Sequence, residues 1–541
     1  GADAVDRIIT FDKMAVPAVA EYKYWEARCE KLPKKIPWLF PPVPVEEEDR
    51  HYEELHRKYA PQLLDVYMKL GGFYYKSGQK VASNMGGFVP KIYQDVCQPF
   101  LNDIPARDPD EVRAVVEAEL KRPREEVFKT WEEKPIGCAS IGQVHRATLM
   151  NGQKVVVKVQ NPEAERTFNG DVFALKTLMD VAMPQLSVAF DEIQKQFATE
   201  FDYRGECRNA IEIRENLKKA GYKDIIVPEV YPELCSAKLM VMEEISPSIP
   251  LHHALDEQAA KMAKQKGVSK EDFVAAEKAR IEAEAQRLAK EGKVMESVSA
   301  GDYDKYIAVQ RLKKWVLRWT VGWWSNEDEG IIVPMNAAKL VDDLLAVHGH
   351  EILIDGVFNA DPHPGNVLYV DGKLALIDYG QVKRIDDEAR LGFAKMILLV
   401  EAAIKVDPRV DPSVRPEVHE RARKAIAAHA RAIGMETEKD LDDSYYDQCV
   451  VYMGRMDAAF LYPRNVIQWS DWIQERDPLG NIDKVDYLVM VNTASMMLRG
   501  LGEMLQQYRN LAVCWRPMAR QALEEKGMLQ EVETEINSWI V

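Results

Sequence analysis

The stretch between residues 359 and 380 is the part of this chain that most restricts its fold. It reads N-A-D-P-H-P-G-N, then V-L-Y-V-D-G-K-L-A-L-I, then D-Y-G. Asp371-Gly372 between two apolar runs predicts a β-hairpin, because a type I′ turn needs positive φ at both of its central residues. Asp361 and Asn366 precede the hairpin, and Asp378 follows it. Two carboxylates and one amide are therefore displayed around a short hairpin.

These three side chains suit phosphate chemistry. One carboxylate can orient or deprotonate an acceptor, and an asparagine oxygen with a second carboxylate can hold Mg²⁺ against nucleotide phosphates, because Mg²⁺ prefers oxygen ligands. The layout is that of a catalytic loop and metal-binding segment of the protein-kinase type. The alternative is a polar loop with a capped hairpin, and the rest of the chain has to decide between the two.

The totals for the chain exclude several classes of protein. With 541 residues the chain is longer than one ordinary domain, which predicts two lobes or a domain with large extensions. A formal net charge of −16 argues against general nucleic-acid binding, which needs a basic surface. The seven cysteines form no C-x-x-C pair, so we expect a reducing compartment and neither a disulfide framework nor a zinc site.

The sequence contains no run that predicts a transmembrane helix. The best candidate, residues 391–406, is interrupted by Lys395, Glu401 and Lys405, so we expect a buried amphipathic helix there. The chain starts at Gly1 without a methionine and shows no signal peptide, which is compatible with a processed or trimmed form.

A lysine inside an apolar strand marks a second candidate site. Lys158 lies within V-V-V-K-V, on the second strand of a hairpin that Asn151-Gly152 predicts. Such a lysine needs a partner, because an unpaired buried charge is costly. We expect Glu206 to be that partner, and Glu200 and Asp202 are further acids nearby. The alternatives are an edge-strand lysine facing solvent and a solvated acidic helix face.

The first 120 residues are predicted to be mainly helical. A first helix over 15–31 should end at Pro33, and the proline- and aromatic-rich segment 36–42 should form a strap on a partner surface or on the protein's own body. Apolar residues at three- and four-residue spacing then predict helices over 51–120. These include Lys76-Ser77-Gly78-Gln79, which a helix end with a glycine cap would explain equally well.

Two further helices are predicted in the middle of the chain. Residues 273–290 carry mixed charges and a thin apolar stripe, which predicts a solvated helical insertion. In the helix over 311–324, tryptophans recur every four residues beside basic residues: Trp315, Trp319, Trp323, Arg311, Lys314 and Arg318. This helix can lie in a membrane interface, or its tryptophans can pack on the C-terminal lobe.

We therefore expect five parts. These are an N-terminal extension with the strap (1–50), a helical extension with K-S-G-Q (51–130), an N-terminal lobe (131–245), a hinge with a charged helical insertion (246–333), and a helical C-terminal lobe with the catalytic loop and tail (334–541). The strand over 239–244 should act as a hinge whose backbone, at Glu243, offers hydrogen bonds to a purine.

Six motifs occur in one order along the chain: K-S-G-Q, A-S-I-G-Q-V-H-R-A, V-V-V-K-V-Q, E-F-D-Y-x-x-E, A-D-P-H-P-G-N and D-Y-G. This series closely resembles the UbiB/AarF family of atypical protein-kinase-like proteins, and the tail looks most like plant and algal members. The resemblance implies an α+β, bilobal, protein-kinase-like fold. It also implies a family-specific N-terminal helical extension, an extended helical C-terminal lobe, and a link to quinone and isoprenoid lipid metabolism.

The resemblance implies roles for the matching residues. Lys158 would contact the α/β-phosphates of ATP, and Glu206 would hold that lysine. Asp361 matches the catalytic aspartate, while Asn366 and Asp378 match the Mg²⁺ ligands. The alanine-rich loop that replaces the kinase glycine-rich loop matches Ala139, Ser140, Ile141, Gly142, Gln143 and Val144. The K-x-G-Q motif and its companion acids match Lys76, Gly78, Gln79, Glu200 and Asp202.

Three positions depart from the family pattern. Gly137 and Cys138 stand where consecutive alanines usually precede the serine of the loop, which affects nucleotide preference. Asn359 stands where a histidine usually supports the loop around Asp361. Tyr379 replaces the phenylalanine of D-F-G, and its hydroxyl needs a partner when buried.

Together these features predict an atypical kinase or ATPase that binds Mg-ATP and supports quinone or isoprenoid lipid metabolism. We expect a peripheral membrane protein of a plastid or mitochondrion. Its expected partners are a membrane surface or a lipid- or quinone-like small molecule, and other proteins, but no nucleic acid. The alternative is a catalytically weak, pseudokinase-like structural or interaction subunit of an organellar complex. A small-molecule phosphotransferase of the aminoglycoside or choline kinase type shares D-x-x-x-x-N, but it gives no reason for K-S-G-Q or E-F-D-Y.

Overall fold

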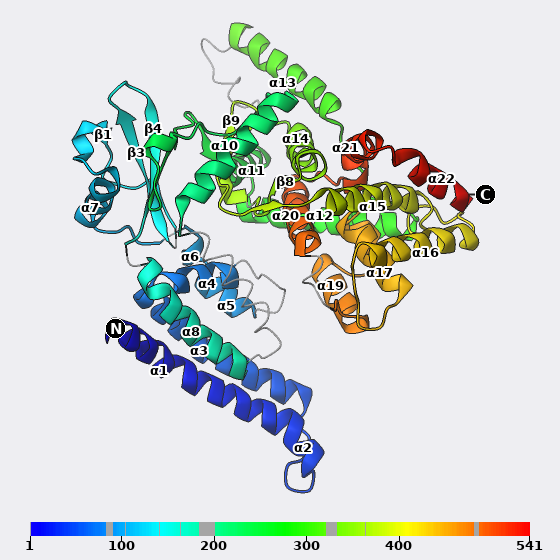
Figure 1. The fold of residues 1–541 in the computed structure, drawn as a ribbon. Helices are drawn as coiled ribbons and strands as arrows, with labels where there is room; N and C mark the ends of the chain where they lie inside the picture. The colour runs from blue at the N-terminus through cyan, green and yellow to red at the C-terminus, as the bar shows by residue number, and fades with distance from the viewer. Residues whose placement is uncertain are drawn as a thin grey trace. The chain divides into compact units, whose positions relative to one another are not determined.

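The computed structural model of the chain describes residues 2–82, 90–102, 104–139, 141–162, 164–182, 201–320, 333–362, 364–480 and 486–540. Figure 1 shows its helices and strands as a ribbon. The chain divides into two compact units. Unit 1 contains residues 1–208 and 229–244, and unit 2 contains residues 209–228 and 245–541.

Unit 1 combines a group of N-terminal helices with a small antiparallel sheet. Its helices are α1(Ala2–Glu26), the π-helical turn η1(Ala27–Lys31), α2(Leu32–Lys35), α3(Val45–Leu70), α4(Phe73–Ala82), α5(Lys91–Cys97), α6(Pro99–Asn102), α7(Pro109–Leu120), η2(Arg124–Glu126), α8(Ala164–Ala182) and η4(Pro232–Leu234). Its strands are β1(Phe128–Trp131), β2(Gly137–Cys138), β3(Gly142–Leu149), β4(Lys154–Gln160) and β6(Leu239–Glu243). Helix α10(Tyr203–Ala220) starts in this unit.

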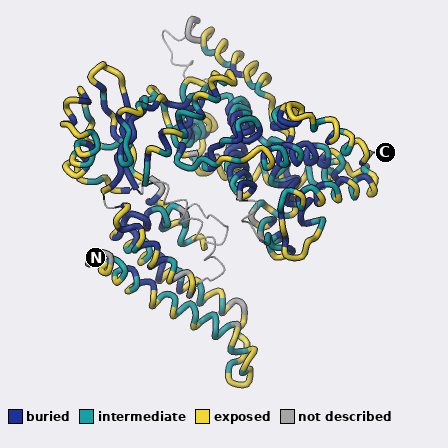
Figure 2. Tube along the Cα trace, in the orientation of Figure 1, coloured by how far each residue is buried: buried dark blue, intermediate teal, exposed yellow. Residues whose placement is uncertain are grey.

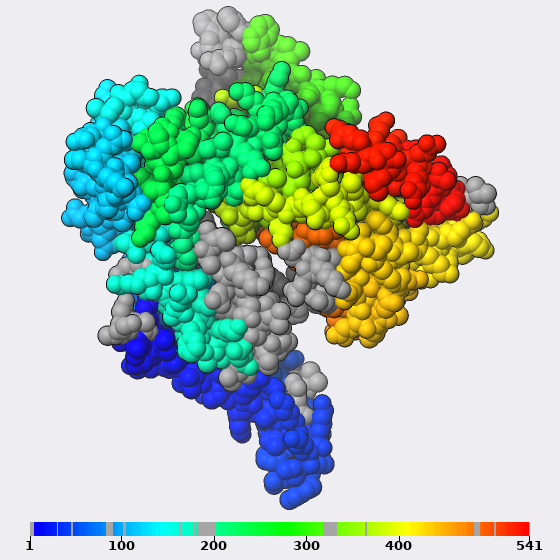
Figure 3. All heavy atoms as spheres, viewed as in Figure 1, coloured from blue at the N-terminus to red at the C-terminus, as the bar shows by residue number. Residues whose placement is uncertain are grey.

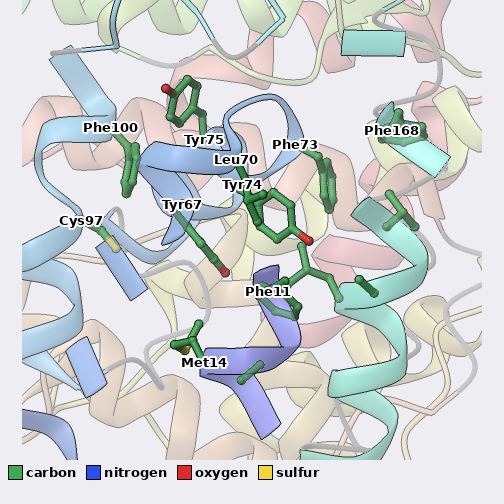
Figure 4. Close-up of a cluster of buried hydrophobic side chains, with 14 of the residues drawn as sticks. Phe11, Met14, Tyr67, Leu70, Phe73, Tyr74, Tyr75, Cys97, Phe100 and Phe168 are labelled. Atoms are coloured by element: carbon green, nitrogen blue, oxygen red, sulfur yellow. The ribbon is translucent and has the colours of Figure 1, made fainter. Parts of the chain in front are cut away.

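The N-terminal helices share an aromatic core. Figure 4 shows this core, in which Phe11 from α1, Tyr67 from α3, Tyr74 from α4 and Phe168 from α8 belong to one buried cluster. A buried ion pair also joins α1 to α8, because the Arg7 guanidinium donates to both carboxylate oxygens of Asp171 at 2.9 and 2.6 Å. The N-terminal helices are thus held to α8 by packing and by a bidentate charged contact.

The start of the chain differs from the sequence-based prediction. Helix α1 begins well before residue 15, and Pro33 does not end the helical path, because it lies in the first turn of α2. In the predicted strap, Trp38 is 83% exposed, so this side chain does not pack on the protein's own body. A partner surface for the strap stays a prediction.

The sheet of unit 1 has the strand order β1-β3-β4-β6, with β2 paired to β3. Alternate valines of β4 (Val155, Val157 and Val159) lie in one buried cluster with residues of α7, as expected for β-branched residues on the core face of a sheet. The hairpin between β3 and β4 forms as predicted, but only Gly152 has positive φ, at 89°. Asn151 instead accepts a hydrogen bond from the N–H of Gln153, so this turn is not type I′.

Unit 2 is largely helical and carries two small sheets. Its helices are α11(Leu251–Lys266), α12(Lys270–Lys290), α13(Ala300–Thr320), α14(Ala337–His350), the π-helical turn η6(Glu351–Asp355), η7(Pro364–Asn366), α15(Asp387–Lys405), α16(Pro416–Ala432), α17(Asp442–Tyr452), α18(Ala458–Leu461), α19(Val466–Arg476), α20(Asp486–Met504), α21(Leu511–Glu525) and α22(Leu529–Ile540). The strands are β5(Ile225–Ile226), β7(Ile249–Pro250), β8(Val357–Asn359), β9(Val367–Val370), β10(Lys373–Leu376) and β11(Val382–Arg384). The sheet orders are β5-β10-β9-β7 and β11-β8.

Helix α15 lies in the core of unit 2, and Figure 2 colours most of it as buried. This confirms the amphipathic helix predicted over 391–406. In the tail, Trp515 is fully buried and donates from its indole N–H to the Leu345 carbonyl at 2.7 Å. Arg499 is also buried, and it donates to the carbonyls of Val451 and Tyr452 at the end of α17. Trp515 and Arg499 therefore stabilise the core of unit 2.

The other predictions about the chain's general chemistry concern membranes and cysteines. Within the described ranges, no helix has both the length and the apolar content needed to cross a bilayer. All seven cysteines are free thiols. Helix α12 forms where the solvated helix was predicted, and the Ser269 hydroxyl caps its first turn by accepting from the Asp272 N–H.

Candidate active site

The predicted hairpin in unit 2 consists of β9 and β10. Its turn residues Asp371 and Gly372 have φ values of 47° and 84°, as a type I′ turn requires. Leu376 pairs with Val367 at the open end, and the N–H of Ile377 continues the ladder to the Asn366 carbonyl at 3.1 Å. The register therefore places Asn366 and the start of the D-Y-G segment side by side.

A second ladder brings the catalytic loop to the same place. Strand β8 pairs with β11, and the N–H of Ala360 donates to the Gln381 carbonyl at 2.9 Å. The Asn359 side chain then joins the two segments, because its Oδ1 accepts from the Asp361 N–H and its Nδ2 donates to the Asp378 carbonyl, both at 2.9 Å. The segments that carry Asp361, Asn366 and Asp378 are thus joined to one another in unit 2.

Asn359 supports the backbone of the loop that carries Asp361. It is buried and uses both ends of its amide to hold the loop before Asp361 against the segment that carries Asp378. The departure from the family's histidine therefore replaces one hydrogen-bonding side chain with another. A histidine would offer one donor and one acceptor in its neutral form, and asparagine offers the same pair.

The side chains of Asn366 and Asp378 fit a hard cation. Asn366 and Asp378 supply oxygen donors, and the Asp378 Oδ1 accepts from the Gly380 N–H at 2.9 Å, which orients the carboxylate. Among the described residues no group of three or more His, Cys, Asp and Glu side chains converges as a metal cage. Two protein oxygens are what Mg²⁺ commonly takes when nucleotide phosphates and water supply its other ligands. The donor set therefore fits Mg²⁺ held together with a nucleotide.

A buried carboxyl group lies behind the catalytic loop. Glu351 is fully buried, and its Oε2 accepts from the Asn359 N–H at 3.2 Å. Burial raises the pKa of Glu351 from 4.5 to about 8. Glu351 was not predicted from the sequence, because it lies in an apolar run at the end of a helix with no motif to mark it.

Tyr379 stands where D-F-G has phenylalanine. It is fully buried, and in the part of the chain that the structure describes its hydroxyl has no hydrogen-bond partner. The partner expected for this hydroxyl is therefore not found. Burial and the nearby carboxyl groups of Glu351 and Asp378 hold the pKa of Tyr379 well above 10, so the residue stays neutral.

In unit 1, Lys158 and Glu206 form the expected pair. The Lys158 Nζ lies 2.8 Å from both carboxylate oxygens of Glu206, and the two side chains are only 16% and 6% exposed. The ammonium group also lies 5.0 Å from the ring centre of Tyr203. Neither the edge-strand lysine nor the solvated acidic face describes these two residues. The strand and α10 instead hold one charged pair in a largely buried place.

The loop predicted over residues 139–144 is shorter than expected. Gly142, Gln143 and Val144 belong to strand β3, and Val144 pairs with Lys158 across the ladder. The turn itself is closed by the Ala139 N–H, which donates to the Gly142 carbonyl at 2.7 Å, and it includes the buried Ile141. Ser140 lies outside the described residues. The resemblance had extended the loop too far because sequence motifs do not show where strand pairing begins.

Two of these residues have structural roles. A Cβ on Gly142 would lie 2.5 Å from the Tyr203 hydroxyl and 2.7 Å from the Val159 carbonyl, so only glycine fits beside the tyrosine that supports Lys158. The Gln143 amide is buried, accepts from the Arg107 N–H and bonds to the His145 ring, each at 2.8 Å. In this arrangement the hydrogen bonds of the Gln143 side chain go to other protein groups and not to a nucleotide.

The K-S-G-Q motif lies in α4, where Gly78 is in the helix interior and has no positive φ. The glycine-cap interpretation is therefore wrong. A Cβ on Gly78 would lie 2.3 Å from the Phe100 ring, and the Gln79 amide donates to the Phe100 carbonyl at 3.0 Å. The glycine allows a close approach of Phe100, and Lys76 is half-buried on the same helix.

The other residues predicted for the site in unit 1 are Asp202, Glu200 and Glu243. Asp202 is 45% exposed and binds the Arg204 guanidinium at 2.8 Å, which lowers the pKa of Asp202. Glu200 lies outside the described residues. At the end of β6, the Glu243 N–H already donates to the Glu229 carbonyl at 2.8 Å. Purine recognition at the predicted hinge would therefore fall to other backbone groups of this strand.

Replacing Gly78 with alanine tests the packing of the motif. We expect the variant to lose about 1–3 kcal/mol of unfolding free energy from overpacking against Phe100, although alanine has the higher helix propensity. Urea unfolding measures this difference. Gly500→Ala is the control, because a Cβ there meets no atom within 4 Å, and it should be neutral or slightly stabilising. Equal effects of the two substitutions would contradict this account.

Comparison with known proteins adds to this geometry. Residues 100–278 and 325–407 match the family model of the ABC1 atypical kinase-like domain. The match includes Lys158, Glu206, Asp361, Asn366 and Asp378, whereas K-S-G-Q lies before it.

Curated relatives carry the same domain. The chain is 31% identical over 221 residues to an ABC1 family protein of Schizosaccharomyces pombe, covering 39% of this chain and 41% of that protein. It is 32% identical over 212 residues to the chloroplastic protein ACTIVITY OF BC1 COMPLEX KINASE 7 of Arabidopsis thaliana, covering 38% and 30%. It is 30% identical over 204 residues to AarF domain-containing protein kinase 1 of Xenopus laevis, covering 37% and 39%. The aligned regions thus span less than half of each relative.

The matched domain, the mixed helices and sheets, and the ordered motifs agree on one fold, an α+β kinase-like fold. The chain belongs to the ABC1/AarF family of atypical kinase-like proteins.

Proposed function

We propose that this protein is an Mg-ATP-dependent atypical kinase or ATPase that acts on a lipid- or quinone-like small molecule at a membrane. The observation that carries the proposal is the bidentate Lys158–Glu206 pair, with both nitrogen–oxygen distances at 2.8 Å. A largely buried lysine held by one carboxylate is the arrangement that kinases use to contact the α/β-phosphates. It is favoured here over the pseudokinase alternative because every charged group of the phosphate chemistry is present.

Each candidate residue has a role in this proposal. Asn366 and Asp378 would hold Mg²⁺, which supplies charge neutralisation for the phosphates. Asp361 would accept the proton of an acceptor hydroxyl while that oxygen bonds to the γ-phosphorus and ADP leaves, or it would orient a water in the same way. Asn359 would position Asp361 through the hydrogen bond to its backbone N–H.

The family resemblance and the motif on α4 support the proposed class of acceptor. The resemblance implies that Lys76 and Gln79 lie on the acceptor side, where a kinase would admit a peptide. A small or lipid-like acceptor, or water, is therefore proposed rather than a protein substrate. A plastid or mitochondrial location is part of the proposal, and the name of the chloroplastic Arabidopsis relative supports it.

Turnover by the full chain tests the proposal. We expect ATP hydrolysis that needs Mg²⁺ and rises when vesicles containing a quinone or phenol are added. Asp378→Asn should lower that rate by at least about a hundredfold, because removal of a metal-holding charge acts on the transition state. If wild type and Asp378→Asn show the same background rate under every condition, the enzyme proposal fails. Stoichiometric recovery in a protein complex without turnover would instead support the pseudokinase alternative.

A further inference from the structure

Helix α13 presents an apolar stripe to solvent. Tyr306, Val309, Leu312 and Trp315 follow one another at three-residue spacing, Val316 lies four residues after Leu312, and each of the five is between 42% and 60% exposed. Figure 2 colours most of α13 as exposed, and Figure 3 shows its green atoms on the outer surface of unit 2. Singly exposed apolar residues are ordinary, but five of them along one helix form a patch.

The opposite side of the helix packs on the protein. Ile307 is buried, and at about 100° per residue it lies across the helix from the centre of the stripe. The start of α13 is also tied down, because the Asn336 amide donates to the Ala300 carbonyl and to Asp304. The exposed stripe is therefore not a misplaced core face, since the helix already has a core face on its other side.

This answers the question left open for Trp315. The sequence allowed its indole to pack on the C-terminal lobe or to lie in a membrane interface. At 59% exposure, Trp315 is not a core residue. Trp323 and the side chain of Trp319 lie outside the described part of the chain.

The charge around the stripe indicates which kind of surface the stripe contacts. Residues 305–320 contain five basic residues and no acidic one, in a chain whose net charge is −16: Lys305, Arg311, Lys313, Lys314 and Arg318. Lys305 pairs with Asp302, but within the described part of the chain Arg311, Lys313 and Lys314 form no ion pair. Basic residues flanking an apolar stripe are the pattern of helices that lie in the headgroup region of an anionic membrane. Two copies of this face would instead repel each other.

From these observations we infer that α13 is a membrane-docking helix that lies flat on an anionic lipid surface. Its stripe would enter the boundary between headgroups and acyl chains, and Arg311 and Lys313 would reach the lipid phosphates with their alkyl stems along the apolar surface. The helix has 21 residues and is therefore about 30 Å long. This inference rests on the proposed function in that it identifies the element that brings the protein to a lipid-like acceptor.

Vesicle co-sedimentation of the full chain tests it. We expect wild type to bind phosphatidylcholine vesicles that contain phosphatidylglycerol more tightly than vesicles of phosphatidylcholine alone, and high salt to weaken that binding. The double substitution Val309→Ser and Leu312→Ser should weaken binding to the anionic vesicles by about tenfold or more, because two side chains lose their apolar burial. Arg311→Gln with Lys313→Gln should remove most of the preference for the anionic vesicles.

Val268→Ser with Val274→Ser is the matched control, because these side chains of unit 2 are 45% and 49% exposed on a different segment. The control should bind vesicles as wild type does. Equal binding of wild type to both kinds of vesicle, unchanged binding of the Val309 and Leu312 variant, or a fall in the control of the same size would overturn the inference. So would a change of oligomeric state in the stripe variant without vesicle binding by wild type, which would make the stripe an interface between copies.

Nucleotide binding by the same variants separates this inference from the proposed function. Both α13 variants should bind Mg-ATP with wild-type affinity, since all four substituted side chains are exposed. Loss of vesicle binding with unchanged nucleotide binding supports the docking role. Selective vesicle binding by a wild-type protein that binds no nucleotide would contradict the proposed function and leave the docking role standing.

Discussion

Replacing Glu206 with glutamine is expected to lower the unfolding free energy of the protein by about 3–5 kcal/mol, because it leaves the Lys158 charge largely buried without its carboxylate. Lys158→Met should weaken nucleotide binding by about ten- to a hundredfold, since a charged hydrogen bond to phosphate contributes about 1.5–3 kcal/mol. The pair is bidentate, with nitrogen–oxygen distances of 2.8 Å, and only 16% and 6% exposed, so solvent screens it little. Chemical unfolding measures the loss of stability in the Glu206 variant, and calorimetric titration measures nucleotide binding by the Lys158 variant.

The double variant completes a thermodynamic cycle. Because methionine and glutamine together leave no buried charge, the double variant should be more stable than the sum of the two single losses predicts. Arg146→Gln is the matched control. It breaks a 2.8 Å ion pair between β3 and Glu244, the residue after β6, but Arg146 is 48% exposed, so the loss should stay below about 1 kcal/mol and nucleotide binding should not change. Equal losses in the Glu206 and Arg146 variants would contradict the structural role given to the buried pair.

The second large effect concerns pH and the carboxyl group behind the catalytic loop. Because burial raises the pKa of Glu351 from 4.5 to about 8, the folded protein keeps a proton that the unfolded chain releases. The stability contributed by this proton is fully present below pH 4.5 and is lost as the pH rises through 8. From this residue alone, wild type should lose about 1.4 kcal/mol of unfolding free energy per pH unit in that window.

Glu351→Gln should remove this dependence while keeping an oxygen that accepts from the Asn359 N–H. The variant should match wild type near pH 5 and be more stable by roughly 4 kcal/mol near pH 8, where wild type must bury a charge or take up a proton. Thermal unfolding across this pH range measures the difference. Parallel curves for the two proteins would show that Glu351 does not titrate in this way.

The two hairpins show how far the sequence determines local structure. Asp371-Gly372 predicted a type I′ turn, and both residues have the required positive φ, because the turn depends only on its own two residues. At Asn151-Gly152 the same signal predicted the hairpin correctly but not its turn type, since Leu149 pairs with Gln153 and the loop between them has three residues instead of two. Local signals thus identified the strands better than their ends.

Contacts between distant segments were harder to predict. The Lys158–Glu206 pair was predicted because one strand held an unexplained charge, whereas Glu351 was missed because burial alone makes it unusual. Asn359 was identified only as a departure, and its two hydrogen bonds depend on a strand pairing that no local pattern shows. Gly78 was assigned to a helix end. Glycine is instead needed at this position because tertiary packing brings the ring of Phe100 against it.

We propose that this protein holds Mg-ATP through Asp378 and its neighbours. Calorimetric titration of the full chain with ATP, with and without Mg²⁺, tests it most directly when Asp378→Asn is compared with Asp371→Asn. The control makes the same chemical change at the exposed turn of the same hairpin, where asparagine also tolerates the positive φ. We predict Mg²⁺-dependent binding by wild type and Asp371→Asn, and its loss in Asp378→Asn. Binding that ignores Mg²⁺, or that is the same in all three proteins, would contradict the claim.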